Sequence, residues 1–173
     1  GLAGLTSAIH LAKAKYKVLL IEKNSYPKHK VCGEYVSNEV LPYLKHLGFN
    51  PLEFGAKQIS NFELTTHNNK SIKANLPLGG FGMSRYEMDF QLYQLALKNG
   101  VEVIKDSVID VNFEADIFKV ETKSNDIFQS KIVIGAFGKR SNLDVKFNRK
   151  FIAKKSPYLG VKIHVSGDFP EDK

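Results

Sequence analysis

Two glycines and a glutamate near the start of the chain have the spacing of a nucleotide-binding turn. Gly1 and Gly4 match the last two glycines of a G-x-G-x-x-G turn, whose backbone N–H groups and helix N-terminus face a pyrophosphate. Glu22 lies about twenty residues further on, where an acidic side chain accepts hydrogen bonds from ribose hydroxyls. The three residues predict a dinucleotide site. The alternative is a helix that begins with two incidental glycines and a surface glutamate. A carboxylate at this place favours an unphosphorylated ribose, as in FAD or NAD, over NADP.

The cysteine and histidine residues do not form the patterns that bind metals. Cys32 is the only cysteine, so the chain forms no internal disulfide and no cysteine zinc cluster. The five histidines show neither i, i+4 pairs nor the spacing of a metal site. We therefore expect no metal, and the sequence also has no G-x-S-x-G nucleophile elbow.

Three segments have the pattern of helices. They cover residues 2–15, about 37–47 and 86–99. Ser37 is a typical N-cap for the second segment, and Gly48 and Gly100 are typical of the ends of the second and third. The first segment leads through a turn into residues 18–21, whose unbroken apolar character is typical of a buried parallel strand.

Alternation of apolar and polar residues predicts strands in the rest of the chain. The expected strands are residues 59–64 and 71–74 of a β-hairpin, 101–112, 117–122 and 127–131 of a small antiparallel meander, and the single strands 132–134 and 158–165. Pro77 and the glycines that follow it up to Gly82 predict a flexible loop. This order of elements indicates an α/β domain through which part of a second sheet is threaded.

A second glycine turn, far downstream, carries a resemblance to a known family. The segment GAFGKRS, residues 135–141, resembles the G-A-D-G-x-x-S segment of FAD-dependent flavoproteins of the p-hydroxybenzoate hydroxylase-like superfamily. Residues 30–34, KVCGE, are similar to the cysteine-glycine motif of the geranylgeranyl reductase branch. Residues 83–92 are similar to the family's x-x-R-x-x-L/F-D-x-x-L element. The resemblance covers essentially the whole chain, with its motifs in the expected order.

The resemblance implies a Rossmann-like FAD-binding domain of the glutathione-reductase type, with a β-meander, and part of an inserted substrate-binding β-sheet. Residues 1–58 and 84–150 are expected to form the FAD-binding domain, with its first strand missing. Residues 59–83 and 151–173 are expected to be parts of the substrate-binding domain. We therefore expect residues 1–173 alone to bind FAD much less well than a chain with the first strand, and to be inactive if the missing pieces are essential.

The same resemblance assigns roles to individual residues. Those expected at the cofactor are Gly1, Gly4, Glu22, Lys23, Gly33, Arg85, Gly135, Gly138, Arg140 and Ser141. Cys32 and Glu34 are the candidate catalytic residues, and the alternatives are a packed thiol and an ordinary loop glutamate. Phe137 stands where the family has an aspartate that bonds the ribityl hydroxyls, and phenylalanine cannot accept that bond. Arg140 is expected to compensate as a donor to the pyrophosphate.

The implied function is that of an FAD-dependent oxidoreductase that reduces a C=C bond of a prenyl or lipid-like substrate, with NADPH or NADH as electron donor. One alternative is an FAD-dependent monooxygenase, either a hydroxylase or a halogenase. The chain has no tryptophan, which disfavours the halogenase because its motif contains one. An alternative of another class is a basic, non-enzymatic module that binds nucleic acid or a membrane surface.

The charge of the chain bears on its partners. The net charge is +7 and the pI is about 9.4, but the lysines are mostly single and arginines are few. This favours a solvated lysine-rich surface over a specific nucleic-acid site. No run of about 18 apolar residues predicts a membrane span. We expect a small hydrophobic substrate and a cytoplasmic protein, with peripheral membrane contact and oligomeric state left open.

Overall fold

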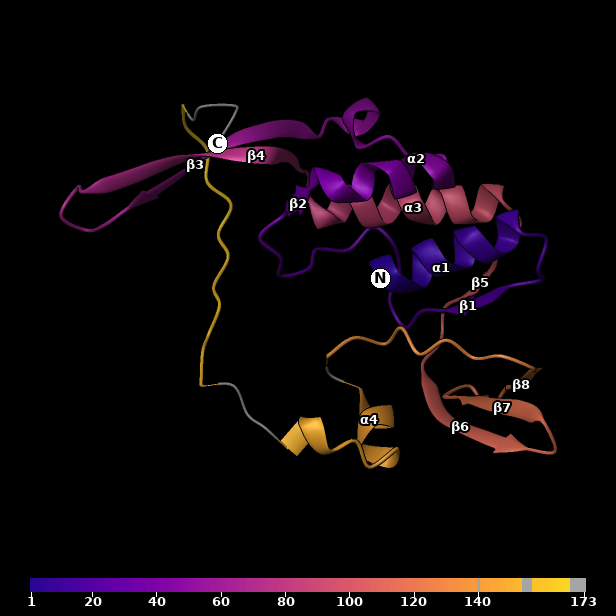
Figure 1. Ribbon diagram of the computed structural model, residues 1–173. Coiled ribbons are helices and arrows are strands. Elements are labelled where there is room, and N and C mark those ends of the chain that lie inside the picture. Colours follow the sequence, from indigo (N-terminus) through magenta and orange to yellow (C-terminus); the bar gives the residue numbers. More distant parts are fainter. Residues whose placement is uncertain (140, 154–156, 169–173) are drawn as a thin grey trace.

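The centre of the computed structural model is a parallel pair of strands covered by helices. The structure describes residues 1–139, 141–153 and 157–168. β1 (Leu19–Ile21) pairs in parallel with β5 (Glu102–Ile104). α1 (Leu2–Lys13) packs on this pair, and α2 (Leu41–Leu47) and α3 (Arg85–Lys98) lie on the far side of α1 (Figure 1). The arrangement confirms the predicted α/β class with a Rossmann-like unit.

The helices begin and end close to the positions that the sequence indicates. Ser37 caps the 3-10 turn η1 (Asn38–Val40) that precedes α2, and Gly48 ends α2 in the left-handed conformation with φ of 89°. The Oγ of Ser84 caps α3 by accepting a hydrogen bond of 3.2 Å from the N–H of Glu87. These serines satisfy backbone donors that a helix leaves free at its first turn.

The hydrophobic core lies where these helices meet. Leu5 and Ile9 of α1, Leu44 of α2, and Leu92 and Ala96 of α3 are at most 1% exposed. Because these residues follow the helical repeat, each helix turns one apolar stripe toward the others. This packing fixes the first turn of α1 next to the end of β1.

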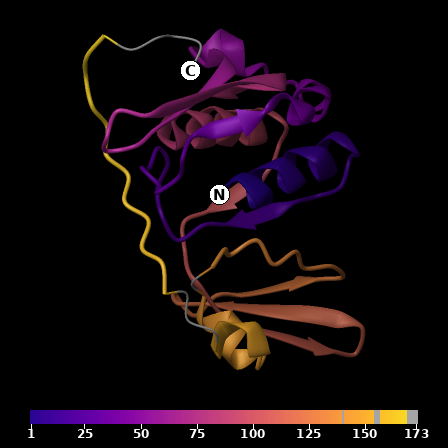
Figure 2. The same ribbon diagram turned by 60° about the vertical axis from the view of Figure 1, so that its left-hand side comes forward.

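A second sheet contains the predicted hairpin. Its strand order is β2–β4–β3, with β2 (Tyr35–Ser37), β3 (Lys57–Thr65) and β4 (Ser71–Gly82) all antiparallel to their neighbours. The β3–β4 hairpin projects away from the helices (Figures 1 and 2). The hairpin confirms the sequence-based prediction, although both strands are longer than expected.

The prediction of a flexible loop from Pro77 to Gly82 is wrong. β4 continues through this segment because β2 pairs with its last residues. The ring of Tyr35 lies where a side chain at Gly80 would stand, so the glycine lets the ring cross the strand closely. The glycines therefore serve a paired strand rather than a loop.

The third sheet is the expected meander. β6 (Val108–Glu114), β7 (Ile117–Thr122) and β8 (Ile127–Ser130) are antiparallel in that order. The first predicted run, residues 101–112, is wrong as a single strand of the meander. It divides into two strands, because its first part (β5) pairs with β1 and its second part (β6) pairs with β7. Short helical turns complete the chain: η2 (Pro51–Phe54), α4 (Asn142–Lys146) and η3 (Lys150–Ala153).

Two further strand predictions are also wrong. Residues 132–134 form no strand, and the side chains of Ile132 and Ile134 are 74% and 54% exposed rather than buried. Residues 158–165 also form no strand, and their apolar side chains are exposed, with Leu159 at 89% and Val161 at 75%. An apolar extended segment becomes a strand only when its backbone pairs with another strand, and within the described residues neither segment is paired in this way.

Candidate nucleotide-binding site

The N-terminus of α1 presents free backbone donors. Gly1 is its N-cap, no side chain caps the helix, and the first turn contains no acidic residue. The N–H of Leu5 donates to the Gly1 carbonyl at 3.0 Å and begins the helical hydrogen bonding. The N–H groups before it and the positive end of the helix dipole therefore favour an anion.

Gly4 allows α1 to approach two other segments closely. A Cβ at this position would lie 3.3 Å from Cδ1 of Leu20 and 3.4 Å from Cβ of Ala136. Even this one carbon would crowd the Leu20 side chain and touch Ala136, so a larger side chain would not fit without moving α1. The structure thus brings the second glycine segment, residues 135–138, against the start of α1.

The carboxylate of Glu22 lies at the end of β1 and contacts Gly1. Its Oε2 accepts hydrogen bonds from the Gly1 nitrogen at 3.0 Å and from the Tyr26 hydroxyl at 3.2 Å. Its Oε1 accepts from the backbone and side-chain nitrogens of Asn24 at 3.2 and 3.3 Å. Glu22 therefore places a carboxylate acceptor beside the glycine turn.

Two cations flank Gly1 and share one buried carboxylate. A Cβ at Gly1 would lie 2.8 Å from Nζ of Lys30 and 3.9 Å from Nη2 of Arg85. Arg85 donates two hydrogen bonds to Asp89, at 2.8 and 2.9 Å, and Nζ of Lys30 lies 3.4 Å from the same carboxylate. Asp89 is fully buried and orients both cations. Two cations against one carboxylate leave a positive charge next to the N-terminus of α1.

Cys32 and Glu34 share a loop but differ in their surroundings. The half-buried thiol of Cys32 lies beside the Arg85 guanidinium. The Glu34 carboxylate accepts from the Arg85 backbone N–H at 2.9 Å and also contacts Lys162 and His164. Burial tends to raise the pKa of Glu34, but these hydrogen bonds lower it overall. An ionised, fully engaged carboxylate suits a positioning role better than that of a general acid.

The second glycine segment presents an aromatic ring rather than an oxygen. A Cβ at Gly135 would lie 2.8 Å from the ring of Phe137, so the ring folds back over this glycine. The Arg149 guanidinium lies 5.8 Å from the centre of the same ring, in a cation–π contact. Gly138 has a φ of 77°, and Ser141 caps α4. Phe137 therefore contributes packing and no acceptor.

The remaining predicted residues lie further apart. Lys23 is exposed on the loop after β1, and Gly33 borders a separate pocket. Arg140 lies outside the described residues. Within the described part of the chain, no group of three His, Cys, Asp or Glu side chains is arranged to hold a metal ion.

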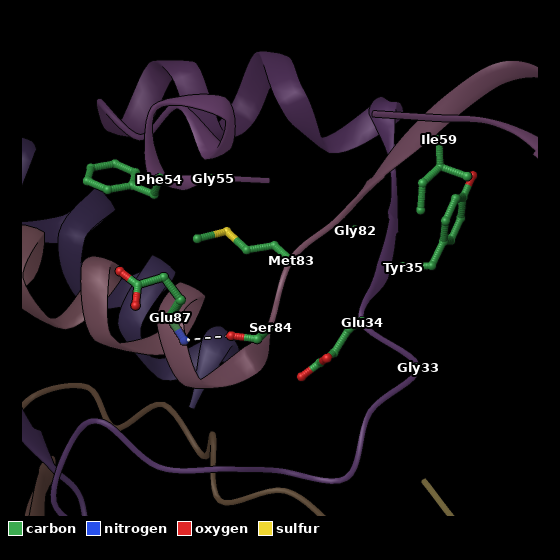
Figure 3. A pocket seen from close by; sticks show the side chains of 10 residues that line it. All are labelled: Gly33, Glu34, Tyr35, Phe54, Gly55, Ile59, Gly82, Met83, Ser84 and Glu87. Atoms are coloured by element: carbon green, nitrogen blue, oxygen red, sulfur yellow. Dashed lines mark hydrogen bonds between the residues drawn. The ribbon is translucent and has the colours of Figure 1, made fainter. Parts of the chain in front are cut away.

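The separate pocket is a cavity of about 410 Å³ (Figure 3). Its walls are residues 33–35, Phe54 and Gly55, Ile59, and residues 82–84 with Glu87. The end of β4 and the first turn of α3 form one side, and η2 with Gly55 forms another (Figure 3). No local sequence pattern predicts this pocket, because its walls come from five elements.

No protein-family model matches the chain. An uncharacterized protein of Methanosarcina barkeri is 28% identical over 156 residues, covering 86% of this chain and 38% of that protein. Halogenase PltM in complex with phloroglucinol and FAD is similar in structure, with a TM-score of 0.68 and 17% identity over 84% of this chain and 34% of its own.

Two more solved structures are similar. The flavin-dependent brominase Bmp2 has a TM-score of 0.69 and 21% identity, over 88% of this chain and 38% of its own. 2-Methyl-3-hydroxypyridine-5-carboxylic acid oxygenase has a TM-score of 0.67 and 24% identity, over 79% of this chain and 37% of its own. This chain therefore spans little more than a third of the length of the proteins it resembles.

The chain has the fold of a flavoprotein FAD-binding domain.

The flavoprotein fold agrees with the superfamily that GAFGKRS indicated, and these structures give no support to the geranylgeranyl reductase branch in particular. Lys30 is the residue at the α1 terminus that sequence reasoning missed. The only feature of the sequence that could have indicated Lys30 is its position two residues before Cys32. Its orientation depends on Asp89, which lies on α3 and is distant in the sequence. The expected Lys23 lies one residue after Glu22 and is exposed instead.

Proposed function

We propose that this chain binds FAD and belongs to an FAD-dependent oxidoreductase. One observation carries the proposal: the uncapped N-terminus of α1 faces Lys30 and Arg85, with the Glu22 carboxylate beside it. This combination of free N–H groups, two cations and one carboxylate matches a pyrophosphate followed by a ribose. The flavoprotein fold supports FAD as the dinucleotide.

The residues present fit this cofactor with two adjustments. Gly1 leaves open the space that a Cβ would take, next to Lys30. The four hydrogen-bond donors on Glu22 already use both of its oxygens, so a ribose hydroxyl would replace one of them, such as the Asn24 amide. Phe137 offers no acceptor to a ribityl chain, so that contact falls to backbone groups or to water.

FAD, when bound, supplies hydride transfer or oxygen chemistry, and the protein supplies binding, orientation and proton transfer. In this proposal Lys30 and Arg85 hold the pyrophosphate and Glu22 holds the ribose. Cys32, next to Arg85, is the candidate proton donor to a substrate carbon. Glu34 keeps its loop attached to the start of α3.

The reaction has two candidate forms. The KVCGE motif at residues 30–34 supports reduction of a C=C bond in a prenyl or lipid-like substrate. The similarity to a halogenase, a brominase and an oxygenase supports a monooxygenase at least as well. NADPH or NADH is the proposed electron donor in both forms. The substrate is a small hydrophobic molecule, and the hairpin residues 59–83 with residues 151–173 belong to the part that binds it.

Attachment to a membrane, if it occurs, would be peripheral in this proposal. None of the helices in the described ranges combines the length and apolar character required to cross a bilayer.

The first test is the absorption spectrum of the purified protein before and after incubation with FAD. We expect a flavin spectrum and a saturable titration. A colourless protein that cannot be loaded with FAD, and that binds polyanions in a salt-sensitive manner, would overturn the proposal in favour of a basic binding module.

The second test separates the two reactions. The flavin is reduced anaerobically with NADPH or NADH and then mixed with geranylgeranyl diphosphate, still without oxygen. Reoxidation by the prenyl compound together with loss of its C=C bond supports the reductase. Reoxidation only after oxygen is admitted, with uptake accelerated by an aromatic substrate such as phloroglucinol, supports the monooxygenase.

A further inference from the structure

The 410 Å³ pocket differs in charge from the rest of this basic chain (Figure 3). The charged side chains that line it are the carboxylates of Glu34 and Glu87, and no lysine, arginine or histidine is among its lining residues. Its apolar walls include Phe54, Met83 and Ile59. Its volume lies in the range of pockets that hold small ligands, about 300–1,000 Å³.

The two carboxylates are in different states. Glu34 is already paired with Lys162 and His164. Glu87 has one side-chain partner, the neutral amide of Gln91, which donates to its Oε1 at 2.7 Å. Within the described residues no cation is within ion-pair distance of Glu87. The pocket therefore contains one half-buried carboxylate without a counter-ion.

The Glu87 carboxylate takes no part in the hydrogen bonds that cap α3. Ser84 and Glu87 have the S-x-x-E spacing of a capping box, in which the glutamate bonds back to the start of the helix. Here the Ser84 hydroxyl accepts from the Glu87 N–H, but the carboxylate that accepts from the first turn is that of Glu34, which bonds to Arg85 N–H. The Glu87 carboxylate accepts from Gln91 instead, and it lies beside the cavity, facing Phe54 in Figure 3.

We infer that this pocket binds a small apolar amine, whose ammonium group pairs with Glu87 and whose apolar body lies against Phe54 and Met83. An ammonium gains a charge-assisted hydrogen bond from the carboxylate and is attracted by an aromatic face. An anion of the same size meets two carboxylates and no cation in the lining. The binding requires no flavin, so it goes beyond the oxidoreductase proposal and stands independently of it.

The test uses three probes that share one apolar body: 2-phenylethylamine, 2-phenylethanol and 3-phenylpropionate. Binding to the wild-type protein is measured by ligand-observed NMR and by calorimetry at neutral pH. We expect the amine to bind about tenfold more tightly than the alcohol, as one charge-assisted hydrogen bond implies, and the carboxylate not to bind. This comparison needs no variant, so it does not depend on any substitution being tolerated.

Three variants locate the site. Glu87→Gln is expected to weaken the amine about tenfold, to the affinity of the alcohol, while leaving the alcohol unchanged. Gly33→Leu, at a position where an added Cβ meets nothing within 4 Å, is expected to fill the pocket and weaken both ligands. Glu39→Gln, which removes the same charge from an exposed residue outside the lining, is expected to change neither.

The inference is overturned if none of the probes binds, if 3-phenylpropionate binds as tightly as the amine, or if Glu87→Gln or Gly33→Leu leaves amine binding unchanged in a folded protein. Flavin loading is measured on the same preparations. A protein that takes up FAD but not the amine refutes the amine pocket alone, and a protein that binds the amine but not FAD refutes the oxidoreductase alone.

Discussion

The Glu34 carboxylate accepts a hydrogen bond of 2.9 Å from the backbone N–H of Arg85. Glu34 directly precedes β2, and Arg85 is the first residue of α3. The contact therefore joins the second sheet to the helix that carries a proposed cofactor-binding side chain. The same carboxylate also contacts Lys162 and His164, so it connects three segments that are distant in the sequence.

Glu34→Ala is expected to lower the free energy of unfolding by about 1–2 kcal/mol, the usual effect of losing a helix cap. Glu34→Gln is expected to cost less, because its amide oxygen still accepts from the Arg85 N–H. Urea unfolding followed by circular dichroism measures both. Equal stability of wild type and Glu34→Ala would show that the cap contributes nothing.

The contribution of Glu34 is expected to depend on pH. Its pKa in the folded chain is below its ordinary value of 4.5, so its stabilisation is present above pH 4.5 and is lost as the pH falls through the lower, folded pKa. The difference in unfolding free energy between wild type and Glu34→Gln is expected to be constant near neutral pH and to shrink below 4.5. A difference that grows on acidification would contradict this assignment.

Lys30→Met is expected to weaken FAD binding about tenfold, because it removes one cation from the proposed pyrophosphate site. Lys28→Met is the matched control, since Lys28 is an exposed lysine of the same loop. Flavin fluorescence titrations at two salt concentrations give both affinities and the salt dependence. If the two variants lose affinity equally, the general basic charge of the chain is responsible and Lys30 has no special role.

Gly4→Val is expected to destabilise the protein by about 1–3 kcal/mol through overpacking, because even its Cβ would lie 3.3 Å from Leu20 and 3.4 Å from Ala136. Ala3→Val makes the same side chain at an exposed position of α1 and is expected to cost only the loss of helix propensity, about 0.5 kcal/mol. Thermal and chemical unfolding compare the two. Equal losses would mean that Gly4 is not a packing constraint.

Local signals in the sequence predicted local structure well. Ser37 and Gly48 act over the few residues next to them, and each has the capping role that its type indicates. The polar turn between β3 and β4 likewise lies between strands that pair with each other. In these cases the residue and its partner lie within one short window of sequence.

Predictions failed where the partner is distant. Residues 77–82 have the composition of a loop, but β2 pairs with their last residues. Nothing in this segment indicates that the ring of Tyr35 crosses it at Gly80. Residues 132–134 and 158–165 have the composition of strands, but a strand also requires a neighbour that composition does not supply.

The candidate site divides in the same way. Gly1, Gly4 and Glu22 belong to one continuous helix–strand unit, so their spacing alone predicts that they lie close together. The position of Lys30 next to Gly1 was not predicted, because it depends on Asp89, a buried residue of α3.

The pairing of β1 with β5 also has a consequence for how the chain folds. Leu19 lies opposite Glu102, and the whole of the second sheet and α3 are encoded between them. On a ribosome, the β3–β4 hairpin is complete before β5 has been synthesised, whereas β1 remains without its strand partner until β5 emerges. Non-local parallel pairing of this kind is slow. In pulse-labelling hydrogen exchange, we expect amides of the hairpin to become protected before those of β1, and the nucleotide site to be the last part of the protein to acquire its shape.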